Sequence, residues 1–126
     1  MTLPTCLMTK TARAHLEKII RDTARQWGYE QAVIYRHALS VGFQEIAKNH
    51  KKFNSPYRDD MAKGTDFSLH HIEHHYIAFQ AHGGNSVIIV GILPERMNIP
   101  ERLKELQSMS QHEIDTILSL IEKQAE

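Results

Sequence analysis

Two apolar runs in the second half of the chain, residues 76–79 (YIAF) and residues 87–93 (VIIVGIL), say most about the fold, together with the segment 94–98 (PERMN) that follows them. The turn-forming residues 83–85 separate the runs, and such a separation between two β-rich segments is typical of a β-hairpin. Residues 67–70 (FSLH) predict a further strand before the hairpin. We therefore expect a small, largely antiparallel sheet.

Two amphipathic helices are predicted ahead of this sheet. Thr9 or Thr11 is a suitable N-cap for the first helix, and Gly28 is suited to end it. With so few residues between them, the helices should form an antiparallel hairpin. Residues 4–8 predict an edge or first strand. The apolar positions that recur at helical spacing are Ala12, Leu16, Ile19, Ile20, Thr23 and Trp27 in the first helix, and Ala32, Tyr35, Leu39, Phe43, Ile46 and Ala47 in the second.

The segments on either side of the sheet are less regular. Residues 49–64 are polar and basic and contain Pro56 and Gly64, which favours a loop. After the sheet, Pro100 should open a helix, and Ser110 to Glu113 has the spacing of a capping box for a last helix.

We expect one domain at residues 1–103 and a C-terminal helical extension at residues 104–126. Its apolar residues should be covered, either by folding back over the domain or by a second chain in a homodimer.

Composition and charge exclude several classes of protein. The apolar fraction is 41%, as in ordinary globular proteins. The longest apolar run is far shorter than the roughly 20 residues needed to span a bilayer. Cys6 cannot form an internal disulfide, and as part of a strand it should be buried and inert. We expect a soluble, cytoplasmic protein without a membrane partner.

The zero net charge hides an uneven distribution. Residues 1–63 carry eleven Lys and Arg against six Asp and Glu, and residues 64–126 carry four against nine, so the halves are +5 and −5. The basic half could meet an acidic partner, but the global positive charge of most nucleic-acid binders is missing.

The order of strand, helix hairpin and three antiparallel strands resembles the RelE/ParE toxin superfamily of type II toxin–antitoxin systems, in particular its ParE (plasmid stabilisation) branch. Residues 75–79 (HYIAF) resemble the family's His-x-Ile-Phe-Tyr strand, and residues 90–98 (VGILPERMN) resemble its closing Ile-Leu-His-x-Arg-Met-Asp. Pro94 and Asn98 depart from that pattern. The resemblance covers about residues 5 to 103 and implies an α+β fold.

The resemblance to the ParE branch implies a toxin that inhibits growth by binding DNA gyrase and is neutralised by a cognate antitoxin, without a catalytic residue or cofactor of its own. We expect a toxin–antitoxin hetero-oligomer in which the antitoxin lays a helix across the hairpin, around Arg13 to Arg36, and extends towards the sheet. The expected partner-binding residues are Arg13, Arg21, Arg25, Trp27, Arg36, Lys51, Lys52, Arg58 and Arg96.

The main alternative is a ribosome-dependent mRNA endoribonuclease of the RelE type. Such a reaction needs cations on the scissile phosphate and a general acid or base. The only candidates are His71, His75, Tyr76 and Arg96. RelE's strand arginine would fall near Tyr76, and no Arg occurs between Arg58 and Arg96, which disfavours this alternative.

A histidine cluster supports a third hypothesis, a non-toxic, metal-binding relative. His70, His71, His74 and His75 lie within six residues, and imidazole is a common ligand for zinc, copper and iron. If the segment forms a strand and a turn, the imidazoles alternate between faces and leave at most a weak pair, so we expect no metal.

Trp27 has two interpretations. Its place at a helix end on the apolar stripe favours burial in the core, and the alternative is a surface anchor for a partner.

Overall fold

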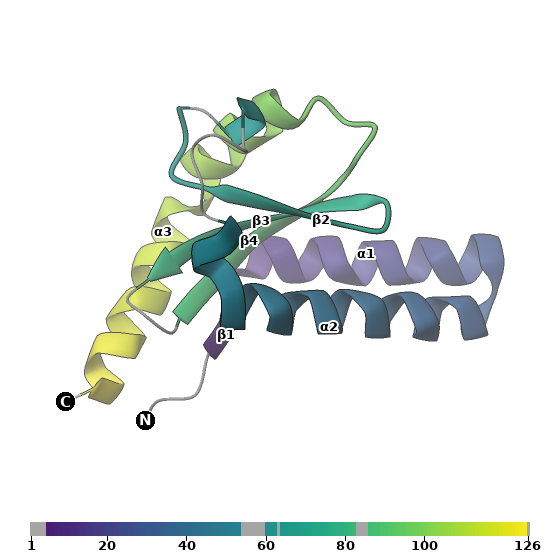
Figure 1. The fold of residues 1–126 in the computed structure, drawn as a ribbon, viewed down its shortest axis with the longest axis horizontal. Helices are drawn as coiled ribbons and strands as arrows, with labels where there is room; N and C mark the ends of the chain where they lie inside the picture. Colours follow the sequence, from purple (N-terminus) through teal and green to yellow (C-terminus); the bar gives the residue numbers. More distant parts are fainter. Residues whose placement is uncertain (1–4, 54–59, 63, 83–85, 126) are drawn as a thin grey trace.

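The computed structural model describes residues 5–53, 60–62, 64–82 and 86–125 (Figure 1). In chain order the elements are β1 (Thr5–Met8), α1 (Lys10–Trp27), α2 (Tyr29–Phe53), the short 3-10 helix η1 (Asp60–Ala62), β2 (Ser68–Ile72), β3 (His75–His82), β4 (Ser86–Pro94) and α3 (Ile99–Ala125). The predicted first strand, helix hairpin and three later strands are all present. Arg58, one of the expected partner-binding residues, lies outside the described residues.

The four strands form one sheet in the order β1-β4-β3-β2. β2 and β4 each pair with β3 antiparallel, whereas β1 pairs with β4 parallel through Thr5↔Ser86 to Met8↔Ile89. This confirms the largely antiparallel sheet of the expected α+β fold. β1 lies at an edge, as predicted.

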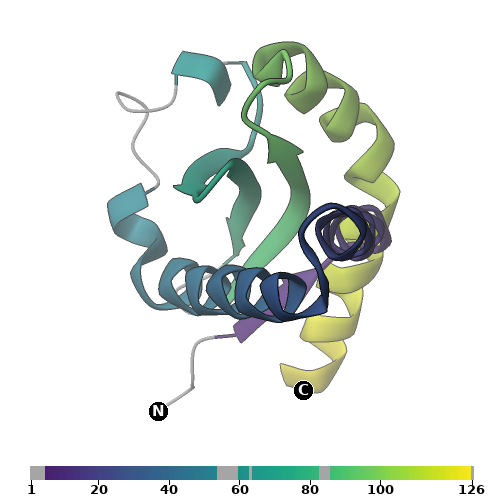
Figure 2. The same ribbon diagram turned by 90° about the vertical axis from the view of Figure 1, so that its right-hand side faces the viewer.

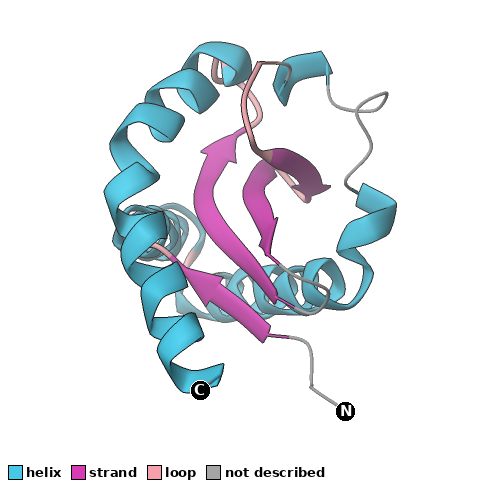
Figure 3. Cartoon of the chain, turned by 90° about the vertical axis from the view of Figure 1, so that its left-hand side faces the viewer, coloured by secondary structure: helices cyan, strands magenta, loops and turns pink. Residues whose placement is uncertain are grey.

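Helices cover both faces of the sheet (Figures 2 and 3). The α1–α2 hairpin buries Leu39, Phe43 and Ile46 against Phe79 and Ile89 on one face. On the other face, α3 packs its own apolar residues against a second cluster of sheet residues. Because β4 lies inside the sheet with a buried cluster on each side, its residues 87–93 are all buried, which explains why its sequence is apolar without alternation.

The hairpin is defined by a cap at each end of α1. The Thr9 side chain accepts a hydrogen bond from the Ala12 N–H at 3.1 Å, so Thr9 is the N-cap. Gly28 ends the helix with φ 96° and ψ 167°, and its N–H donates to the Ala24 carbonyl. This backbone conformation is essentially limited to glycine. Beyond the sheet the hairpin continues without cover from other elements (Figure 1).

Replacing Gly28 by alanine should lower the free energy of unfolding by about 1–3 kcal/mol, because a Cβ strains this backbone. A Cβ at this position would meet no atom within 4 Å, so the cost is conformational rather than steric. Urea unfolding of Gly28→Ala measures it. Tyr29→Ala is the control, since Tyr29 is exposed and in a helix; equal stability of the two variants would contradict the prediction.

Two predicted boundaries were wrong. The loop expected from residue 49 begins later, because α2 continues to Phe53 across a kink at Asn49 (φ −127°, ψ 23°). No Pro or Gly lies between Phe43 and Pro56, so nothing in the sequence stops the helix at Asn49.

The two helices predicted after Pro100 are one continuous helix, α3. Ser110 is buried inside α3 and does not cap a new helix. α3 folds back over the domain through Leu103, Leu106 and Ile114, each at most 3% exposed.

Candidate functional site: a groove between the helix hairpin and the sheet

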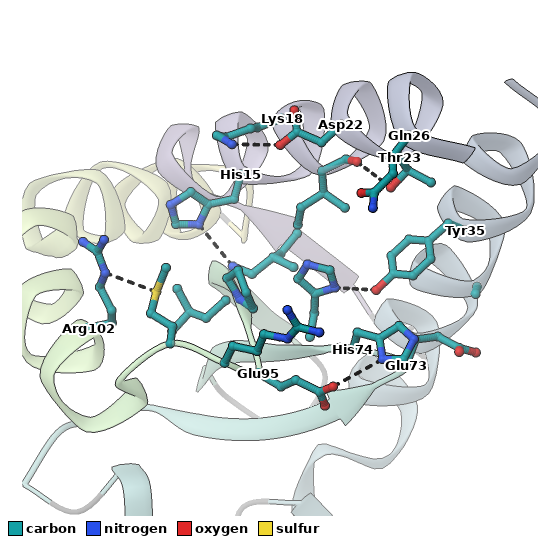
Figure 4. A pocket seen from close by; sticks show the side chains of 18 of the residues that line it. His15, Lys18, Asp22, Thr23, Gln26, Tyr35, Glu73, His74, Glu95 and Arg102 are labelled. Carbon is teal, nitrogen blue, oxygen red and sulfur yellow. Dashed lines mark hydrogen bonds and ion pairs between the residues drawn. The ribbon is translucent and has the colours of Figure 1, made fainter. Parts of the chain in front are cut away.

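A groove with a volume of about 1000 Å³ lies where α1, α2, the β2–β3 turn, the end of β4 and the start of α3 meet (Figure 4). α1 contributes the longest series of lining residues. They recur every three or four positions and therefore share one face of the helix: Thr11, His15, Lys18, Ile19, Asp22, Thr23, Gln26 and Trp27. From position 11 to position 27, at 1.5 Å per residue, the groove follows α1 for about 24 Å.

Inside the groove, His15 of α1 forms a hydrogen bond with the backbone of β4. β1 ends at Met8, opposite Ile89, so β4 has no neighbouring strand beyond that point on this side. The Ile92 N–H donates instead to His15 Nδ1 at 3.2 Å. Burial, with a smaller contribution from the positive charge of Arg102, lowers the pKa of His15. His15 is therefore neutral at pH 7, with its proton on Nε2.

The β2–β3 turn is tied to the segment after β4. Glu73 takes a positive φ of 54° in this turn. The Glu95 carboxylate lies 2.8 Å from His71 Nε2 and 3.3 Å from His74 Nδ1, and the Glu95 N–H donates to the His74 carbonyl at 3.0 Å. Hydrogen bonds from His71 and then His74 lower the pKa of Glu95. Both ends of the turn are thus held at the mouth of the groove.

Tyr35 of α2 joins the hairpin to the sheet. Its hydroxyl shares a hydrogen bond with His75 Nδ1, and the two rings meet edge to face with centroids 5.6 Å apart. Burial lowers the pKa of His75, with a smaller effect from the charge of His74. Burial also raises the pKa of Tyr35. Both side chains are therefore neutral at pH 7. Their contact bridges α2 and β3 at the floor of the groove.

Two of the exposed groove residues, Trp27 and Arg96, are suited to contact a partner. Trp27 is 68% exposed, so the expectation that it belongs to the core was wrong. It lies in the last turn of α1, beyond the cover of the sheet. Arg96 is exposed, and within the described part of the chain it has no hydrogen bond or ion pair. The groove therefore offers an aromatic anchor and an unpaired cation.

Comparison with known proteins agrees with this architecture. Residues 7–99 match the family described as the ParE toxin of the type II toxin–antitoxin system, parDE. The chain belongs to the ParE toxin family. A curated relative, Toxin ParE of Escherichia coli, is 31% identical over 99 residues, which are 79% of this chain and 92% of the relative.

The fold also matches a solved structure, described as the chromosomal ParDE TA system from P. aeruginosa. The TM-score is 0.60 at 14% identity, covering 73% of this chain and 96% of that one. This ParE-family chain is therefore a toxin of the ParDE type, as the sequence resemblance implied.

Two of the four residues of the endoribonuclease alternative, Tyr76 and His75, lie on opposite faces of the sheet in this ParE-type fold. His71 pairs with Tyr76 across β2 and β3, and their rings lie 4.7 Å apart. Tyr76 packs on the α3 face of the sheet. Its neighbour His75 points to the hairpin face, where it reaches the groove with Arg96.

Two of the histidines considered as metal ligands share one partner, Glu95, and the other two have different contacts. His71 and His74 contact Glu95, His75 contacts Tyr35, and His70 pairs with Ile77 in the sheet register. Within residues 5–53, 60–62, 64–82 and 86–125, no three His, Cys, Asp or Glu side chains are placed to share a metal ion. The same ranges hold no helix long and apolar enough to cross a membrane.

Of the nine expected partner-binding residues, Trp27 and Arg96 line the groove. The exposed arginines Arg13, Arg21, Arg25 and Arg36 lie on the hairpin outside it. Lys51 and Lys52 lie in the last turn of α2, and their side chains are not described.

Sequence reasoning missed His15, Tyr35 and Met109 as groove residues. The signal for His15 was its position beside the apolar stripe of α1. The half-exposed Tyr35 hydroxyl and Met109 gave no such signal, because their roles depend on β3 and on the path of α3.

Finally, Cys6 is half-buried, not fully buried as expected. Burial raises the pKa of its thiol to about 11, which leaves it protonated and weakly nucleophilic.

Proposed function

We propose that this ParE-family toxin arrests growth by binding DNA gyrase and that a cognate antitoxin neutralises it by placing an amphipathic helix in the groove. The observation that carries the antitoxin site is the shape of the groove. Its length of about 24 Å along α1 corresponds to a helix of about 16 residues, which exceeds the reach of most small ligands. Amphipathic helices bind such apolar-floored grooves through residues at helical spacing.

The chemistry of the groove supports a helix with mixed polarity. Ile19, Ile34 and Ile92 give it apolar lining, while Lys18, Asp22 and Glu105 lie among its polar residues. Arg96, without a partner in the described residues, suits a carboxylate on the antitoxin. Trp27, as a large exposed aromatic residue, suits the role of an anchor at the hairpin end.

Binding to gyrase is supported by family membership and by the separation of the ribonuclease candidates. Tyr76 packs on the α3 face of the sheet, whereas His75 contacts Tyr35 on the hairpin face, so these two candidates face opposite sides of the sheet. The RelE-type reaction is therefore the weaker hypothesis. A non-toxic, metal-binding relative is also less supported, because His71 and His74 contact Glu95 whereas His75 contacts Tyr35 on α2.

Induced expression in Escherichia coli should stop colony formation and produce DNA breaks while mRNA remains intact. Co-expression of the cognate antitoxin, which we expect to be encoded beside this gene, should restore growth. The purified toxin should inhibit supercoiling by gyrase in vitro. Rapid cleavage of translated mRNA without DNA breaks would contradict the gyrase proposal and favour the endoribonuclease. Normal growth, with stoichiometric metal in the purified protein, would favour the non-toxic relative.

A further inference from the structure

One wall of the groove is formed by a part of the chain outside the matched family region. The match ends at residue 99, where α3 begins. Arg102, Glu105, Leu106 and Met109 of α3 nevertheless line the groove. Their spacing of three, one and three residues places them on one side of the helix. The segment added after the family region therefore helps to shape the groove.

This part of α3 is held rigidly by contacts on its core side. Leu103 and Leu106 are buried, and Leu106 packs directly over Gly91 of β4, where an added Cβ would lie 2.6 Å from its Cδ1 atom. Further along α3, the Glu113 carboxylate accepts hydrogen bonds from the Lys10 N–H at 2.6 Å and the Thr11 hydroxyl at 2.7 Å. α3 is thus fixed to both β4 and α1.

The groove side of α3 presents an apolar residue and an exposed ion pair. Met109 is 63% exposed although α3 has a core face, and methionine adapts to irregular apolar partners. About two turns before Met109, Arg102 Nη1 lies 3.0 Å from Glu105, and Arg102 Nε donates to Met97 Sδ at 3.1 Å. These contacts hold the guanidinium and the carboxylate in place beside Met109 (Figure 4 shows Arg102).

We propose that Arg102, Glu105 and Met109 select the cognate antitoxin by contacting the end of its helix that lies farthest from Trp27. This inference rests on the proposed function, because it assigns the occupant of the same groove. The helix would place an apolar residue on Met109 and polar residues against the Arg102–Glu105 pair. A carboxylate for Arg96, which has no partner within the described part of the chain, would complete the match. An antitoxin from a relative without α3 would lack the residues that fit this wall.

The test measures the affinity of purified toxin variants for the antitoxin that we expect to be encoded beside this gene. Met109→Glu places a charge where an apolar partner residue should lie and should weaken binding about tenfold or more. Met109→Gln, which is neutral and similar in size, should weaken it less. Leu120→Glu is the matched control, because Leu120 is an exposed apolar residue of α3 that does not line the groove, and its affinity should stay unchanged. Thermal unfolding verifies that each variant folds.

Growth arrest provides a second readout. Met109→Glu should remain toxic and should escape neutralisation by this antitoxin. If the wild-type toxin binds the antitoxin tightly and Met109→Glu binds it with the same affinity, the proposed role of α3 is wrong. The antitoxin proposal itself would remain intact. If the wild type itself did not bind this antitoxin, the proposed function would fail together with this inference.

Discussion

A chain that ends at Leu103 should fail to form a stable folded domain, although residues 1–103 contain the whole region matched to the ParE family. Truncation removes Leu106 and Ile114, which are 3% and 1% exposed, and it uncovers the apolar face of the sheet on which they pack. Losing a buried Leu or Ile side chain costs about 2–5 kcal/mol each. Two such losses approach the total stability of a typical domain, about 5–15 kcal/mol. Thermal unfolding followed by circular dichroism should therefore show no cooperative transition.

The control for this truncation is full-length Leu120→Ser. Leu120 is 56% exposed on the same helix, and its replacement should change the free energy of unfolding by less than about 0.5 kcal/mol. A truncated chain that unfolds cooperatively close to the full-length midpoint would show that the domain ends at residue 103 and that the rest is an appendage.

Glu113→Gln should lower the free energy of unfolding by about 2 kcal/mol at pH 7, because hydrogen bonds to a charged group contribute about 1.5–3 kcal/mol. The Glu113 carboxylate accepts from the Lys10 N–H, the Thr11 N–H and the Thr11 hydroxyl. Its negative charge also lies at the N-terminus of α1, where the helix dipole favours an anion. Urea unfolding of the wild type and the variant measures the difference.

The effect of Glu113→Gln should depend on pH. Burial by itself would raise the pKa of Glu113, but the hydrogen bonds from Thr11 and Lys10 outweigh it and the pKa is lowered from 4.5. A lowered pKa means that the contribution is complete above pH 4.5 and is lost as the pH falls through the folded-state pKa. The difference between wild type and variant should shrink when unfolding is measured at pH 3.

Glu17→Gln is the matched control, because Glu17 is exposed on α1 and has no hydrogen bond or ion pair among the described residues. It should change stability little at either pH. An equal loss for Glu113→Gln at pH 7 and pH 3 would show that packing, and not the carboxylate charge, fixes α3 to α1.

The elements could be predicted because their signals are local. The uninterrupted apolar run of β4 and the helical spacing of Leu39, Phe43 and Ile46 directly reflect burial by neighbouring layers. Ser110 and Glu113 show the limit of this reasoning. Their spacing fits a local capping box, yet Glu113 bonds to residues about a hundred positions earlier in the chain. A local pattern does not show which distant group it will meet.

The groove was only partly predictable for the same reason. Arg96 was expected at a partner surface, whereas a surface anchor was only the alternative to core burial for Trp27. Trp27 proved exposed because α1 extends beyond the sheet that would otherwise cover its apolar stripe. The Tyr35–His75 contact depends on how β3 passes beneath α2, which the spacing of apolar residues does not specify.

The bond between Ile92 and His15 has a consequence for self-association. An unpaired strand edge can form hydrogen bonds with a strand of another copy of the chain, which leads to aggregation. β1 protects β4 only as far as Ile89, and beyond it an imidazole occupies the donor that an invading strand would use. In this toxin a side chain therefore occupies the hydrogen-bonding position on β4 that β1 does not reach, which leaves it unavailable to a strand from another chain.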